Sequence, residues 1–161
     1  MLILKAEKLP FVPVRVCAVL CDEFFWRNMV GMNYPKLTAR YLLTHLPSAD
    51  YQLTQMDYRD AGVQEIIASK PHLIVLEWDP VLLEEMMALA RAIRTEKELL
   101  NVPVLGTFDI SQQNAIDNSF HNDYYNTIDS FVVAPIHPVE LQTMIARLLS
   151  GERKKVLSSG T

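Results

Sequence analysis

The sequence predicts a three-layer α/β/α sandwich built around a parallel sheet, and three observations support this fold class. Short apolar runs rich in β-branched residues alternate with amphipathic stretches of helical period. One run, residues 72–78 (HLIVLEW), is almost continuously apolar, which is typical of a central strand covered on both faces. The 161 residues are enough for one domain with a substantial core.

The first half of the chain supplies two strands and two helices. The first helix is placed between Pro35, which suits a first helical position, and Pro47, which suits a stop. The predicted elements are a strand at 14–20, a helix at 36–46, a half-exposed strand at 51–58 and a short helix at 63–69.

The second half continues the alternation. Its clearest helix carries a broad apolar face that includes Leu83, Met86, Met87, Ala90 and Ile93. Residues 111–125 have helical length but no strong apolar face. The predicted elements are a strand at 72–78, a helix at 81–100, a strand at 102–107, a strand at 131–134 and a helix at 138–149.

Strands that alternate with helices pair in parallel through crossover connections. At this size the expected strand order is 2-1-3-4-5, the flavodoxin-like arrangement. We expect an N-terminal extension at 1–13, a single domain at 14–150 and a flexible tail at 151–161.

Composition argues against several classes of function. A formal net charge of −4 is not that of a nucleic-acid-binding protein, and the basic cluster 153–155 is expected to be a solvated tail. No apolar run approaches the ~20 residues that cross a bilayer, and residues 1–13 do not resemble a secretory signal. Cys17 and Cys21 are expected to be buried thiols, which suits a reducing cytoplasm.

Functional groups in such a sheet gather at the carboxyl ends of the strands. An acidic pocket is therefore predicted there. The residues at these ends are Asp22 and Glu23, then Glu77 and Asp79, then Thr107, Phe108 and Asp109, and finally Ala134 and Pro135.

These segments follow the order and spacing of one known family. Asp22-Glu23 matches an acidic pair, residues 71–78 (PHLIVLEW) an acceptor strand, 102–105 (VPVL) a fourth strand, and 131–135 (FVVAP) a fifth. Over residues 14–150 the chain resembles the receiver domain of bacterial two-component response regulators, which are CheY-like proteins. The resemblance implies a domain of signal transduction.

The resemblance also implies functional positions, and the chain departs from most of them. Glu77 replaces the acceptor aspartate, and Ala134 replaces the family's lysine. The hydroxyl position falls on Phe108 by residue count, or on Thr107 if the fourth strand is one residue shorter. Phosphoryl transfer depends on neutralised charge and on positioning within ~1 Å, so we expect no phosphotransfer and no enzymatic activity. Asp79 would lie ~6.6 Å beyond Glu77 along the strand, out of the pocket.

Glu77 is open to two interpretations. It is either a built-in mimic of the phosphorylated state or the result of drift after the chemistry was lost. Drift is favoured because Ala134 removes the cation that would hold a mimic in place. Asp22, Glu23 and Glu77 could still bind Mg²⁺ weakly. No other cofactor is expected, because the chain has no glycine-rich phosphate loop.

The expected function is that of a pseudo-receiver, a phosphorylation-independent module that binds another protein or a second copy. Tyr124, Tyr125 and Phe131 form the candidate contact surface, because exposed tyrosines are typical interface anchors. The aromatic run at 24–26 is the alternative surface. Two rival hypotheses are a competent phosphorelay receiver that uses Asp79 and a flavodoxin-like domain that binds a small ligand or a flavin.

Overall fold

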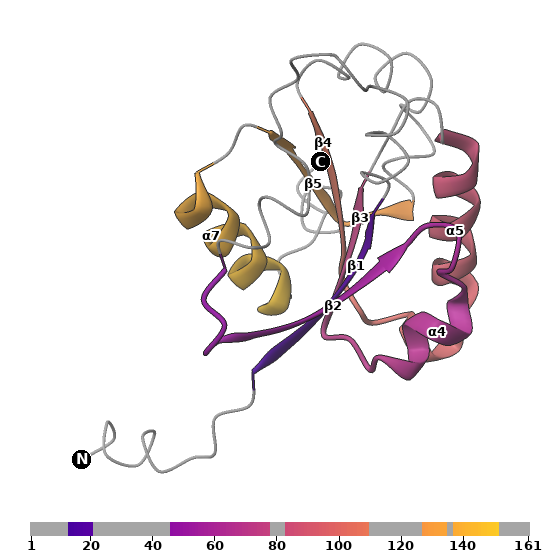
Figure 1. The fold of residues 1–161 in the computed structure, drawn as a ribbon, viewed down its shortest axis with the longest axis horizontal. Helices are drawn as coiled ribbons and strands as arrows, with labels where there is room; N and C mark the ends of the chain where they lie inside the picture. The colour runs from indigo at the N-terminus through magenta and orange to yellow at the C-terminus, as the bar shows by residue number, and fades with distance from the viewer. Residues whose placement is uncertain (1–12, 21–45, 78–82, 110–126, 135–136, 152–161) are drawn as a thin grey trace.

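The computed structural model describes residues 13–20, 46–77, 83–109, 127–134 and 137–151. Five strands form one parallel sheet in the order β2-β1-β3-β4-β5 (Figure 1). This confirms the predicted fold class and strand order. The strands are β1 (Val14–Leu20), β2 (Tyr51–Asp57), β3 (Leu73–Glu77), β4 (Val104–Asp109) and β5 (Ser130–Ala134).

Helices cover both faces of the sheet. On one face lie α4 (Val63–Ala68), α5 (Leu83–Thr95) and the short 3₁₀ helix η2 (Lys97–Leu99), and on the other lies α7 (Pro138–Leu149) (Figure 1). The bounds of α7 are those predicted from its apolar stripe. The predicted helix at 36–46 and the polar segment at 111–125 fall outside the described residues.

Alternation along the strands divides the core into two clusters. All five residues of β3 are buried, as its apolar sequence predicts, whereas β2 at the edge of the sheet is largely half-exposed. The α5-side cluster includes Ile74, Leu76, Met86, Met87, Ala90 and Ile93. The α7-side cluster includes Leu73, Val75, Leu105, Leu141, Ile145 and Leu148.

The long helix predicted at 81–100 was wrong at its C-terminal end. The helix α5 ends at Thr95, and Glu96 adopts an extended backbone (φ −84°, ψ 121°) before η2 begins. This break turns Leu99 into the core and leaves Leu100 about half exposed. The buried Leu99 therefore belongs to a separate 3₁₀ turn and does not continue the apolar face of α5.

The fourth strand was predicted two residues too early. Val102 still belongs to the turn, where its backbone N–H donates to the carbonyl of Leu99 (3.1 Å). Pro103 has no N–H to give to a ladder. Pairing with β3 therefore starts at Val104, which lies beside Ile74, and the strand extends to Asp109.

One side chain connects α5 to the strands beyond it. Arg94 donates from Nε to the carbonyl of Thr127 (2.8 Å) and from Nη2 to Oδ2 of Asp129 (2.5 Å). The same Asp129 oxygen accepts the backbone N–H of Val104 (2.8 Å). The guanidinium therefore fixes the C-terminal turn of α5 against the starts of β4 and β5.

Candidate functional site

Two polar residues are buried at the carboxyl edge of the sheet. Glu77 is the last residue of β3, and its side chain is buried among the strand ends. Thr107 is the residue of β4 that lies beside it in the strand register. Neighbouring parallel strands run about 4.8 Å apart, and paired residues share a face. The register therefore places the carboxylate and the hydroxyl side by side.

Strand alternation decides which face this pair occupies. Leu73 and Val75 of β3 and Leu105 of β4 all belong to the α7-side cluster. Glu77 and Thr107 follow them at steps of two, so they lie on the same face, nearer to the carboxyl edge.

The Thr107 hydroxyl is unusual. Only 4% of this residue is exposed, and its Oγ1 makes no hydrogen bond to any residue that the structure describes. Most buried hydroxyls in proteins have a partner. Of the two predicted hydroxyl positions, Thr107 is therefore the one that carries a buried hydroxyl beside Glu77.

At the end of β5, the structure describes the backbone alone. Strand β5 pairs with β4 so that Ala134 lies beside Asp109 and Val133 beside Phe108. Ala134 is thus the last residue of β5. Asp22, Glu23 and Asp79 fall outside the described residues, and the Mg²⁺ site predicted from Asp22, Glu23 and Glu77 stays a prediction. Among the described residues alone, no three His, Cys, Asp or Glu side chains lie close enough together to hold a metal ion.

The sequence reasoning overlooked one carboxylate at this edge. Asp57 ends β2, in register with Leu20 of β1. Both of its carboxylate oxygens accept hydrogen bonds from Arg59, at 2.8 Å from Nε and 2.9 Å from Nη2, and Oδ1 also accepts the Arg59 backbone N–H. These contacts engage Asp57 with the turn that follows β2.

The predicted contact surface is described at one of its three residues. Phe131 lies on β5, the edge strand, and is half-buried against the α5-side cluster. Part of the Phe131 side chain is therefore packed against the core. Tyr124 and Tyr125 lie outside the described residues. Val139, in the first turn of α7, is 61% exposed, the highest value for a large apolar residue in the described part of the chain.

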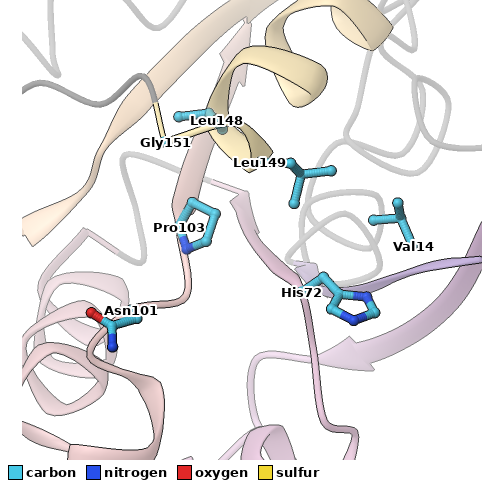
Figure 2. A pocket seen from close by; sticks show the side chains of 7 residues that line it. All are labelled: Val14, His72, Asn101, Pro103, Leu148, Leu149 and Gly151. Carbon is cyan, nitrogen blue, oxygen red and sulfur yellow. The ribbon is translucent and has the colours of Figure 1, made fainter. Parts of the chain in front are cut away.

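A groove opens at the opposite, amino edge of the sheet. Its volume is about 410 Å³, and it lies where β1, β3 and β4 begin and α7 ends (Figure 2). Nothing in the local sequence signals this groove, because its wall is assembled from four distant segments. The lining residues are Val14, His72, Asn101, Pro103, Leu148, Leu149 and Gly151.

His72 is held in the groove wall by the backbone of β1. Its Nδ1 accepts the backbone N–H of Arg15 (2.9 Å), and the backbone N–H of His72 donates to the Arg15 carbonyl (2.8 Å). Burial, and secondly the positive charge of Arg15, lower the pKa of this imidazole below its ordinary value. The neutral ring is the form that fits, because a protonated Nδ1 cannot accept a hydrogen bond.

Three solved structures show what this chain resembles. A candidate response regulator from Chloroflexus aurantiacus J-10-fl has a TM-score of 0.56 at 17% identity, over 86% of this chain and 99% of its own. A sensor protein from Polaromonas sp. JS666 has a TM-score of 0.56 at 12% identity, over 86% and 98%. NtrX from Brucella abortus, solved with ADP, has a TM-score of 0.57 at 18% identity, over 92% of this chain but 29% of NtrX.

The similarity to known proteins is found in the fold. A scan against protein-family models finds no match, and a search of curated proteins finds none. Within the described residues, no helix has the length and apolarity needed to span a membrane. The strand order, the covering helices and the structural matches together show that this chain has the fold of response-regulator receiver domains.

Proposed function

We propose that this chain is a receiver-fold signalling module that acts by binding another protein and is not phosphorylated. The observation that carries the proposal is the buried pair at the carboxyl edge. Glu77 stands at the end of the central strand, next to the Thr107 hydroxyl, which has no hydrogen-bond partner within the described part of the chain, and Ala134 ends β5.

The physical argument concerns charge and distance. A phosphoryl group brings about two negative charges at neutral pH, and its transfer is catalysed by cations placed around it. The alanine side chain at position 134 supplies no cation. The Glu77 carboxylate stands one methylene further from its backbone than an aspartate would, and a displacement of ~1 Å can cost about a hundredfold in rate.

The binding surface that we propose lies on β5 and the start of α7, together with Tyr124 and Tyr125. Two described residues support it. Phe131 on the edge strand is only half-buried, and Val139 on α7 is largely exposed. Phe131 precedes and Val139 follows the end of β5 by a few residues, so the two lie close together along the chain. Aromatic anchors with apolar neighbours are typical of interface centres.

This proposal predicts association that is independent of phosphate. Sedimentation velocity of the full chain, and affinity capture from its native host, should give the same dissociation constant with and without acetyl phosphate and Mg²⁺. Tyr124→Ala, Tyr125→Ala or Val139→Ser should weaken the association by roughly tenfold, since truncating an interface anchor costs more than about 1 kcal/mol. Leu100→Ser, which alters an exposed apolar residue outside this surface, is the matched control.

Two results would count against the proposal. Association that strengthens only with acetyl phosphate would indicate a competent phosphorelay receiver. If the three surface variants fold and bind like the wild type, the contact surface lies elsewhere, and residues 24–26 become the next candidate.

A further inference from the structure

The amino-edge groove has an apolar wall that is open to solvent. Val14 and Leu149 are partly exposed within it, and Leu148 and Pro103 form its buried back. Leu149 retains 37% of its surface and ends α7, at the amino edge of the sheet, whereas Glu77 lies at the carboxyl edge. Exposed apolar surface gathered in a concavity is typical of a site that another segment covers.

We propose that residues 1–12 of this chain fill the groove, with Phe11 as the main contact. The point where the segment joins the domain supports this occupant. Val14, the first residue of β1, itself lines the groove, so the segment leaves β1 at the groove wall.

The segment has the reach that the groove requires. Crossing from β1 over β3 to β4 takes two strand spacings, or about 10 Å. Phe11 precedes Val14 by three residues, which span about 10 Å when extended. The Phe11 side chain can therefore stand over Pro103 and Leu149 on the far side of the groove.

The sequence of the segment suits the same role. Residues 1–12 read MLILKAEKLPFV, with apolar side chains at Leu9, Phe11 and Val12 next to the domain. Pro10 and Pro13 favour extended backbone in the residues before them, Leu9 and Val12. An extended, apolar stretch is therefore expected where the groove must be crossed.

Residues 152–161 are the other segment that starts at the groove, since Gly151 also lines it. Their sequence, ERKKVLSSGT, begins with four charged residues and carries only two apolar ones. Charged side chains cannot be buried against Leu148 and Leu149 without partners. Residues 1–12 are thus the better match to an apolar wall.

The test is a pair of thermal unfolding experiments on the full chain. Phe11→Ala should lower the Tm by roughly 3–6 °C, the size expected for one partly buried aromatic contact in a domain of this length. In a Leu149→Ala background the same change should lower it by less than half as much, because residues in contact do not act additively. In a Val139→Ala background, at the other end of α7, the full loss should return.

NMR then identifies which chain occupies the groove. Nuclear Overhauser contacts from the Phe11 ring to the methyls of Leu149 and Val14, seen within one molecule, would support the proposal. Contacts found only between differently labelled molecules would overturn it in favour of a second copy. An equal Tm loss in both backgrounds, or none in the wild type, would overturn it as well. None of these outcomes depends on the Glu77 pocket, so they leave the proposed function to its own test.

Discussion

Thr107 carries a buried hydroxyl without a hydrogen-bond partner among the described residues. Such a group costs about 1–3 kcal/mol relative to one that is satisfied. The cost falls beside Glu77, at the carboxyl edge where this fold places its functional groups. Strained or unsatisfied groups often persist at functional sites because something other than stability maintains them.

Replacing Thr107 by valine tests this cost. The substitution keeps the shape and removes the unsatisfied hydroxyl, so the free energy of unfolding should stay the same or rise by about 1 kcal/mol. Urea denaturation measures it. Thr95→Val is the control, since the Thr95 hydroxyl is exposed and bonds within its own helix, and it should change stability by less than about 0.5 kcal/mol. A loss of stability in Thr107→Val larger than in the control would show that the hydroxyl has a partner.

His72 predicts a dependence of stability on pH. Its pKa is lower in the folded chain than the ordinary value of 6.5, first through burial and then through Arg15. The unfolded chain therefore binds this proton more readily. The contribution of His72 is fully present above pH 6.5 and is lost as the pH falls through the lower folded pKa.

The measurement compares wild type with His72→Gln by urea denaturation between pH 7.5 and 5. The wild type should lose more stability over this interval than the variant. If wild type and His72→Gln lose the same stability between pH 7.5 and 5, protonation of the His72 ring does not break its hydrogen bond with the Arg15 N–H.

At the scale of elements, the Arg94–Asp129 pair holds three segments together. It is mostly shielded, with 20% of the Arg94 side chain and 9% of the Asp129 side chain exposed. Asp129→Ala would leave both the guanidinium and the Val104 N–H without this acceptor. We expect a loss of about 2–3 kcal/mol in the free energy of unfolding, the size of a hydrogen bond to a charged group together with its desolvated partner.

Asp129→Asn separates the two parts of that loss. An amide oxygen can still accept the Val104 N–H, so this variant should lose clearly less than the alanine variant. If both variants lose the same free energy of unfolding in urea denaturation, the whole effect comes from the charge of Asp129. If neither variant loses stability, the Arg94–Asp129 network is dispensable.

Element boundaries were predictable where one local signal controls them and failed where tertiary contacts do. Pro138 at the first position marks the start of α7 in the sequence, and in the structure His137 caps the helix through Nδ1, which accepts the Val139 N–H. The end of α5 carries no such marker. The helix ends because Glu96 adopts an extended backbone and Leu99 is then buried in the core. The spacing of apolar residues in the sequence does not reveal this tertiary contact.

For the whole molecule, the alternation of strands and helices predicted the fold, because each element must bury one face against the sheet. The hydroxyl position could be predicted only as Phe108 or Thr107, and the pairing of Thr107 with Glu77 became visible only in the strand register, which starts after Pro103. The amino-edge groove was beyond sequence reasoning, because it requires the ends of four separated elements at one place.

For the whole molecule, we propose that the carboxyl-edge pocket does not accept a phosphoryl group. The most direct test is the intact mass of the full chain after incubation with acetyl phosphate and Mg²⁺, beside a phosphorylation-competent receiver as the assay control. We expect no gain of mass for this chain, because the Glu77 side chain is one methylene longer than aspartate and alanine at position 134 supplies no cation. A stoichiometric gain of ~80 Da, one phosphoryl group, that disappears in Asp79→Asn would contradict it and identify Asp79 as the acceptor.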